Sequence, residues 1–204
     1  MKKFLLLAGI ALLSIRGFVQ SLPADFAISS VSSGTTWSQP VGAAFTKDGL
    51  KLFVWEKNGR VYVCNRNGNN YERQSTPVLD ISPEVLNDRD FGLLGFALDP
   101  NFASNGFIYL LYVVDRRFLM NDGSTPDQID AATIGRVTKY KTTTNGNNLV
   151  ADLSTRTILI GETKSTGMAI LHQSHGIGSL AFAADGTLLV TCGDGACYNH
   201  TDTG

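Results

Sequence analysis

The sequence predicts an all-β protein built from repeated β-hairpin units. After residue 21, short apolar runs alternate with Gly, Asn, Asp and Pro, and no long stretch has the spacing of an amphipathic helix. A gapless repeat occurs at residues 41–49, 92–100 and 178–186. Repetition of one β-rich unit indicates a modular stack of sheets.

The repeat has a small residue, then Phe, then Asp three residues after the Phe. We expect the Phe to be buried between neighbouring sheets, the small residue to allow close backbone approach, and the Asp to form the turn. Such hairpins are typical of β-propeller blades, and the alternative is a β-sandwich with chance similarity. The small residue and Phe pairs are Ala44 and Phe45, Gly95 and Phe96, and Ala181 and Phe182.

Strand and turn signals follow each other along the chain. Residues 52–55 and 61–63 flank Asn58-Gly59, a strong hairpin signal because both residues tolerate positive φ. Later strands are expected at residues 107–112, 134–141, 157–161 and 188–190, with a separating turn at 145–148.

The second interval between repeats is too long for one blade. Phe96 and Phe182 lie 86 residues apart (182 − 96), whereas a blade takes about 40–50 residues. We therefore expect an inserted loop in the polar stretch 115–133, a kind of loop that often lines sites.

The number of repeats predicts an incomplete propeller. The 183 residues after residue 21 (204 − 21) contain three unit starts, whereas a propeller closes with about four to eight blades. We expect an N-terminal portion of about two to three blades, with an unpaired sheet edge. A small complete β domain is the alternative.

Residues 1–21 have the pattern of a secretory signal peptide. Lys2 and Lys3 precede an apolar run, residues 4–13, that is too short to span a bilayer, and residues 19–21 resemble a cleavage site. The alternative, an uncleaved membrane anchor, is disfavoured because Arg16 ends the apolar run early. We expect a secreted or periplasmic protein without a stable membrane span, with one domain at residues 22–204.

The composition and net charge narrow the classes of molecule that this protein is expected to bind. Hydrophobic residues make up 43% and charged residues 17% of the chain, which is typical of globular proteins. Removing Lys2, Lys3 and Arg16 changes the formal net charge from −1 to −4 (−1 − 3), and no basic run follows, so nucleic acid is not an expected partner. The three Cys residues are an odd number, so at least one thiol is free or pairs outside this chain.

Two segments carry candidate site residues. Asp90 lies where a charged loop becomes an apolar strand, and its carboxylate is expected to face a central cavity. His175 immediately precedes a strand, and Asp194 follows the partner strand after the Asp185-Gly186 turn. Antiparallel pairing brings these two ends together, and an Asp-oriented imidazole can serve as a general base. The alternatives are a solvated loop acid and a surface His near a turn Asp, and His172 is interpreted as a neighbour.

Other catalytic motifs are missing from the sequence. It has no Gly-x-Ser-x-Gly elbow, no phosphate-binding Gly-rich loop with Lys, and no His-Glu-x-x-His zinc motif. The Gly-Asp-Gly at residues 193–195 lacks the ligand spacing of a calcium loop.

At these segments the sequence resembles the glucose/sorbosone dehydrogenase family, the soluble sugar dehydrogenases that use pyrroloquinoline quinone (PQQ). The resemblance runs from about Gln39 to the C-terminus, and the Gly-Leu-Leu-Gly-Phe-Ala segment joined to Asp-Pro-Asn-Phe is its most specific part. The matching segments are residues 91–102, 105–109, 174–176, 180–182, 185–188 and 193–195.

The resemblance implies a six-bladed propeller with its active site at one end of the central channel. His175 matches the family's base, which takes the proton of a sugar hydroxyl while hydride passes to PQQ, and Asp194 matches the acid that orients it. Asp90 matches a polar residue that contacts the sugar or the base. Ser174 stands where some relatives have an acid, and Asp90 is shorter than the Gln or Glu of relatives.

PQQ and Ca²⁺ are the cofactors that the resemblance implies. Most of their ligands are expected downstream of Gly204, so no cofactor or metal ligand is assigned to a residue. The implied function is oxidation of an aldose or related alcohol, with a small-molecule sugar as substrate and an unspecified electron acceptor. One alternative is a non-catalytic secreted binding propeller, as in the hedgehog-interacting proteins that share this domain. The other is a lactonase-type propeller hydrolase, of which Gly-Leu-Leu-Gly is not a signature.

Overall fold

The computed structural model describes residues 23–28, 30–32, 35–121, 132–172 and 174–195. The chain divides into two compact units, Met1–Ser30 and Val31–Gly204. In the first unit, a backbone hydrogen bond from Phe26 N to Pro23 O (3.2 Å) closes a turn. The expected signal peptide and Cys197 lie outside the described residues. Of the described helices, none has the length and apolar character needed to cross a membrane.

The first sheet of the second unit is an antiparallel meander in the order β1-β2-β3-β4, with β5 also paired to β3. The expected Asn58-Gly59 hairpin joins β2 to β3: the Asn58 side chain accepts a hydrogen bond from Arg60 N (3.2 Å), and Gly59 has a φ of +94°. The strands are β1 (Pro40–Phe45), β2 (Lys51–Glu56), β3 (Arg60–Asn67), β4 (Asn70–Arg73) and β5 (Leu79–Asp80).

The second sheet has the order β10-β8-β7-β6, with β9 also paired to β8. The expected insertion begins with a short helix, and residues 122–131 of it lie outside the described residues. The turn at 145–148 was predicted, but β9 begins well before residue 157, because strand pairing continues directly from the turn, from Asn145 with Asn148 to Lys141 with Asp152. The elements are β6 (Leu93–Leu98), α1 (Phe102–Asn105), β7 (Phe107–Val113), α2 (Arg116–Met120), β8 (Thr133–Asn145), β9 (Asn148–Ile160) and β10 (Met168–Ile170).

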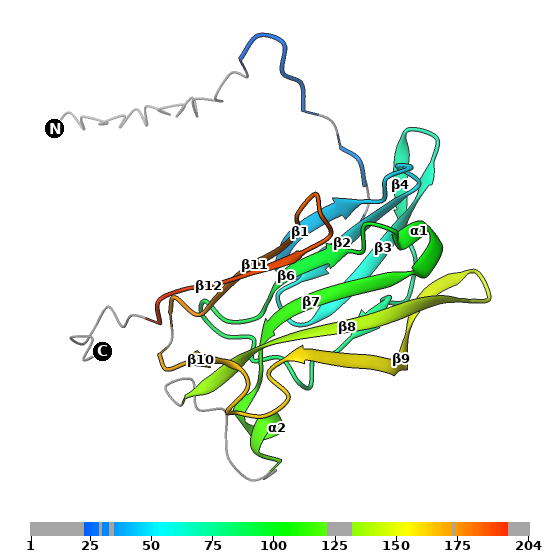
Figure 1. The fold of residues 1–204 in the computed structure, drawn as a ribbon. Helices are drawn as coiled ribbons and strands as arrows, with labels where there is room; N and C mark the ends of the chain where they lie inside the picture. The colour runs from blue at the N-terminus through cyan, green and yellow to red at the C-terminus, as the bar shows by residue number, and fades with distance from the viewer. Residues whose placement is uncertain (1–22, 29, 33–34, 122–131, 173, 196–204) are drawn as a thin grey trace, which may run out of the picture. The chain divides into compact units, whose positions relative to one another are not determined.

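The third sheet is the single hairpin of β11 (Ile177–Phe182) and β12 (Leu188–Cys192), which lies beside β6 (Figure 1). Its turn is closed as the sequence predicts, because the Asp185 carboxylate accepts a hydrogen bond from Thr187 N (2.9 Å). The expected all-β architecture of successive hairpin units is therefore confirmed.

Side chains of the repeat join each sheet to its neighbour. Phe96 of β6 packs on Phe53 and Trp55 of the first sheet, with ring centroids 5.6 and 5.2 Å apart. Phe182 of β11 meets Tyr109 of the second sheet edge to face at 5.1 Å. The repeated Phe thus points back to the preceding sheet in both cases.

The small residue of the repeat faces the following sheet. A Cβ built on Gly95 would lie 3.2 Å from Leu180 N, so the close approach predicted for this position is present. The prediction that every repeat Phe is buried is wrong for Phe45, which is 54% exposed and contacts only Tyr71 among the described rings. Its ring packs edge to face on Tyr71 of β4 and is otherwise open to solvent.

Three apolar cores follow from this stacking. The largest lies between the first and second sheets and includes Phe53, Phe96 and Tyr140. Another lies between the second and third sheets and includes Phe91 and Ile177. The smallest, Leu52, Val54 and Cys64, lies on the outer face of the first sheet under Trp37 and Tyr71. Burial raises the pKa of the Cys64 thiol, which keeps it protonated and unreactive.

An ionic cluster is buried where the connection between the first two sheets meets the second sheet. The Glu84 carboxylate, on this connection, accepts hydrogen bonds from Tyr112 Oη (2.6 Å), Arg156 Nη2 (2.5 Å) and Arg136 Nη1. Arg136 also donates from Nε to Gly161 O (2.6 Å). Burial, and next the charge of Glu84, raise the pKa of Tyr112 well above its usual range. We call these four residues, Glu84, Tyr112, Arg136 and Arg156, the buried ionic cluster.

Candidate functional site

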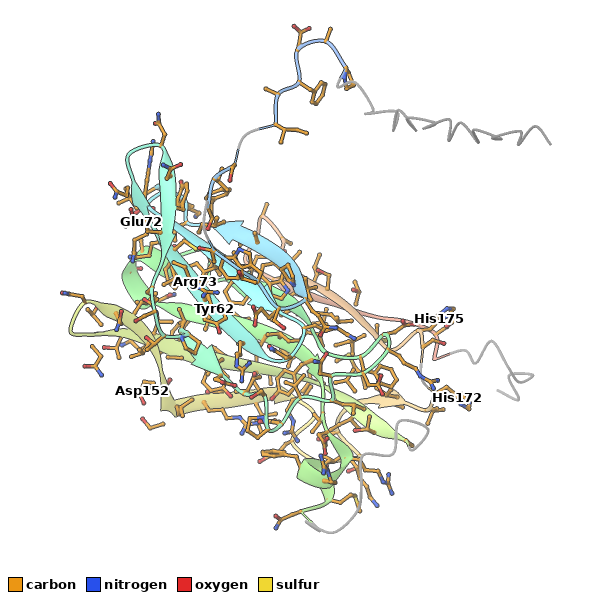
Figure 2. All side chains as sticks on the ribbon, turned by 180° about the vertical axis from the view of Figure 1, so that it is seen from behind. Tyr62, Glu72, Arg73, Asp152, His172 and His175 are labelled. Atoms are coloured by element: carbon orange, nitrogen blue, oxygen red, sulfur yellow. The ribbon has the colours of Figure 1, made fainter. Side chains whose placement is uncertain are left out.

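The predicted site residues gather at one edge of the sheets. Strands β6 and β11 lie side by side, and Asp90 and His175 come shortly before their first residues. A Cβ built on Gly176 would lie 3.3 Å from Phe91 Cε1, so the His175 segment rests on the ring that follows Asp90. Figure 2 shows His172 and His175 together at this edge, with Glu72 and Asp152 at the far side of the sheets.

The β11–β12 hairpin brings His175 and Asp194 into contact, as its predicted geometry requires. Nδ1 of His175 lies 3.0 Å from Oδ1 of Asp194, and their side chains are 59% and 71% exposed. A carboxylate only accepts hydrogen bonds, so the proton of a neutral His175 is on Nδ1. The lone pair of Nε2 is then left to take a proton from a ligand.

The backbone around this pair is tightly held. Gly193 N donates to Gly176 O (2.5 Å), and Gly195 N donates to His175 O (2.9 Å). A Cβ on Gly193 would lie 2.1 Å from His175 O, so only glycine fits there. His175 itself has a φ of +54°, in the left-handed region that costs a non-glycine residue about 1–3 kcal/mol. Strain of this kind is typical of residues held in place for function.

Asp90 is at the same edge but is not joined to the pair. It is exposed, and no hydrogen bond links it to His175 among the described residues. Arg89, directly before it, has a φ of +44°, so the backbone turns just before Asp90. Ser174 is buried, with 7% of its surface exposed, and His172 is exposed. The roles predicted for Asp90, His175 and Asp194 stay predictions.

Sequence reasoning did not single out Lys57. Lys57 is half-buried at the β2–β3 turn, its backbone carbonyl accepts from Leu93 N (2.8 Å), and its stem packs on Gly92. Among the described residues, its ammonium forms no ion pair, and its side-chain stem lies beside Gly92, just before β6. A Lys directly before a hairpin turn was the only sequence signal, because the contact with Gly92 is between sheets.

The described residues contain no group of three His, Cys, Asp or Glu side chains that is arranged to hold a metal ion.

Comparison with known proteins gives a family match over most of the chain. Residues 37–203 match the family model described as Glucose / Sorbosone dehydrogenase. The human Hedgehog-interacting protein is 32% identical over 176 residues, which cover 83% of this chain and 22% of that protein. The HIPL2 protein of Arabidopsis thaliana is 27% identical over 153 residues, covering 63% of this chain and 20% of its own length. The chain spans about a fifth of the length of these curated relatives.

Solved structures share the fold. The PQQ-bound aldose sugar dehydrogenase of Streptomyces coelicolor superimposes with a TM-score of 0.53 at 20% identity, covering 84% of this chain and 42% of that one. A glucose dehydrogenase gives a TM-score of 0.54 at 20% identity, covering 78% of this chain and 38% of that one. At this identity the likeness concerns the arrangement of the sheets, which is that of part of a β-propeller.

Proposed function

We propose, because this chain belongs to the glucose/sorbosone dehydrogenase family, that it oxidises an aldose or a related alcohol with His175 as general base. The observation that supports this role is the His175–Asp194 hydrogen bond at the sheet edge, on a strained backbone.

The chemistry of the chain's own residues is proton transfer. Nε2 of His175 takes the proton of the sugar hydroxyl as the C–H bond at that carbon breaks and the hydride leaves. Asp194 stabilises the resulting imidazolium through Nδ1 and keeps the ring oriented. In this proposal, the Asp90 carboxylate accepts a hydrogen bond from a second hydroxyl of the sugar. PQQ, when bound, supplies the acceptor for the hydride.

One residue of the described part of the chain supports the proposal of PQQ as cofactor. PQQ is anionic, and in this proposal Lys57, a half-buried residue whose side-chain stem packs on Gly92, supplies a cationic partner for one of its carboxylates. For Ca²⁺ the described residues offer no ligand set, so no step is assigned to it.

The experiment uses the complete gene product that contains this chain. Dye reduction is followed with a panel of aldoses and added PQQ and Ca²⁺, for wild type, His175→Ala and the matched control His172→Ala. We expect His175→Ala to lower kcat/KM by about 10²-fold or more, the scale of general-base catalysis, with His172→Ala close to wild type. Equal losses in the two variants, or no loss in either, would contradict the assignment of the base.

A second function is favoured by one observation. The curated relatives, at 32% and 30% identity, are Hedgehog-interacting proteins, whose name describes binding to another protein. The alternative proposal is a secreted, non-catalytic propeller that binds a protein ligand. A well-folded gene product that neither binds PQQ nor oxidises any sugar would favour it over the enzyme.

We further propose that residues 1–21 are a secretory signal and that the site works in the periplasm or outside the cell. Sequencing the N-terminus of the exported protein should begin at Leu22. An intact Met1 on the exported protein would show that the signal is not cleaved there.

A further inference from the structure

The β3–β4 and β8–β9 turns both begin with Asn-Gly. In each turn the Asn is the last paired residue of its strand, and the Gly is the first of two loop residues. Gly68 and Gly146 have φ values of +60° and +59°, and a Cβ built on either would meet no atom within 4 Å. Asn67 and Asn145 are both exposed. The two turns are therefore a matched pair with nearly the same local geometry.

An Asn that is followed by Gly can lose the amide of its side chain. The backbone nitrogen of the Gly attacks the Asn Cγ, so that an N–Cγ bond forms and the Cγ–Nδ2 bond breaks to release ammonia. Water then opens the cyclic imide at either carbonyl, which leaves aspartate or isoaspartate. Gly favours the ring closure because it has no side chain to hinder it. The reaction is slowed when hydrogen bonds hold the Asn side chain or the Gly N–H.

Two of the four Asn-Gly pairs in the sequence are held in this way. At Asn58-Gly59, the glycine nitrogen donates to Glu56 O (3.1 Å). At Asn105-Gly106, the glycine nitrogen donates to Phe102 O (2.8 Å), and the asparagine Nδ2 donates to Asp99 Oδ1 (2.8 Å). Both pairs have their attacking nitrogen engaged, so we expect them to be protected.

The matched pair of turns differs at one hydrogen bond. Asn67 Nδ2 donates to Glu72 Oε1 (2.6 Å), which holds this side chain on β4. Among the described residues, neither the Asn145 side chain nor Gly146 N makes a hydrogen bond. Asn145 is thus the pair in which the amide and the attacking nitrogen can both move into the reactive geometry.

We propose that Asn145 is a deamidation site of this protein and that the Glu72 carboxylate slows the same reaction at Asn67. This modification does not depend on the proposed dehydrogenase activity.

Deamidation would alter the tip of the β8–β9 hairpin. Aspartate adds a negative charge, and isoaspartate also lengthens the backbone by a methylene group, which disturbs the pairing at 145–148. Below the tip, the Gln74 side chain donates to Leu149 O (2.8 Å) and accepts from Leu149 N (3.0 Å), and Ala151 N donates to Val78 O (2.7 Å). We expect the change to remain on the far side of these bonds.

Peptide mass spectrometry of the complete gene product tests the proposal. The protein is incubated at mildly alkaline pH and digested at acidic pH, where the reaction is slow, and the conversion of amide to acid is followed at each Asn-Gly pair. We expect Asn145 to convert first and Asn67 about three- to tenfold more slowly, the scale of one hydrogen bond. Asn58 and Asn105 should be retained longest. Labelling with an isoaspartyl methyltransferase identifies the isoaspartate.

Two comparisons show whether the structure controls the rates. Glu72→Ala should raise the rate at Asn67 to that at Asn145, whereas Glu72→Gln keeps an acceptor oxygen and should leave Asn67 slow. In urea, where the chain is unfolded, the four pairs should convert at similar rates. Conversion of another pair before Asn145 in the folded protein, or an Asn67 rate that Glu72→Ala does not change, would overturn the proposal.

Discussion

The His175–Asp194 pair and the buried ionic cluster are both charged groupings of side chains, but they differ in their surroundings. Both side chains of the pair are largely exposed to solvent, and the two residues lie at the same end of one hairpin. Glu84 and Arg136 are each only 4% exposed, and the cluster joins a connecting segment to three strands of the second sheet. Exposed ion pairs contribute little to stability because water competes for them, whereas a buried charge that loses its partner is costly.

The difference suggests that the cluster has a structural role and the pair a functional one. The cluster anchors the connection that runs on to Asp88, Asp90 and Phe91, while Asp115 N donates to Glu84 O (2.8 Å) from the start of α2. The pair remains accessible, as a base that exchanges protons with a ligand must be. Each of the following changes tests one side of this comparison.

The largest expected effect is on the cluster. Glu84→Ala leaves two guanidinium groups without their shared carboxylate and should lower the free energy of unfolding by about 3–5 kcal/mol. Urea denaturation of the complete gene product measures it, with Glu72→Ala as an exposed control. A loss as small as that of the control would mean that water replaces the carboxylate and that the cluster is not an anchor.

The pair should show the opposite behaviour. Asp194→Asn removes the charge that stabilises the His175 imidazolium, and we expect kcat/KM for the sugar to fall about 10²-fold while unfolding changes by less than about 1 kcal/mol. Steady-state kinetics and denaturation on the same sample give both values. A large loss of stability with a small loss of activity would show that the pair has a structural role instead.

The strain at His175 predicts a smaller effect. Glycine adopts positive φ without steric cost, so His175→Gly should be more stable than His175→Ala by about 1 kcal/mol, although both are inactive. Thermal denaturation of the two variants measures the difference. Equal stability, or a more stable alanine variant, would indicate that the backbone at residue 175 is relaxed.

The smallest effect concerns a turn acid. The backbone hydrogen bond from Thr187, and next its side chain, hold the pKa of Asp185 below its ordinary value of 3.8. A depressed pKa stabilises the folded state above 3.8, and this contribution is lost as pH falls through the lower folded-state value. Unfolding at pH 5 and at pH 2.5 should show a slightly smaller acid-induced loss for Asp185→Asn than for wild type. An unchanged loss would show that this turn does not depend on the charge.

Much of the fold could be predicted because its signals are local. Asn58-Gly59 and Asp185-Gly186 specify their turns through backbone conformation and short-range hydrogen bonds, and the hairpin at 177–192 then brings His175 to Asp194. The start of β9 was missed because strand pairing, more than composition, extends the β8–β9 hairpin.

Contacts between sheets could not be predicted from local sequence patterns. Phe45 has the same repeat pattern as Phe96, yet one is 54% and the other 5% exposed, because burial depends on a neighbouring sheet. Lys57 and Glu84 lie in unremarkable polar stretches, and only the folded chain places them against Gly92 and the two arginines.

By itself, the sequence determined the β-hairpin units, their turns, the resemblance to sugar dehydrogenases, and the candidate pair His175 and Asp194. The tertiary structure decided which side chains are buried between sheets and which groups contact the Glu84 carboxylate. The physical reason is range: turns and strand periodicity depend on neighbours in the chain, whereas burial and charge pairing depend on groups that only folding brings together.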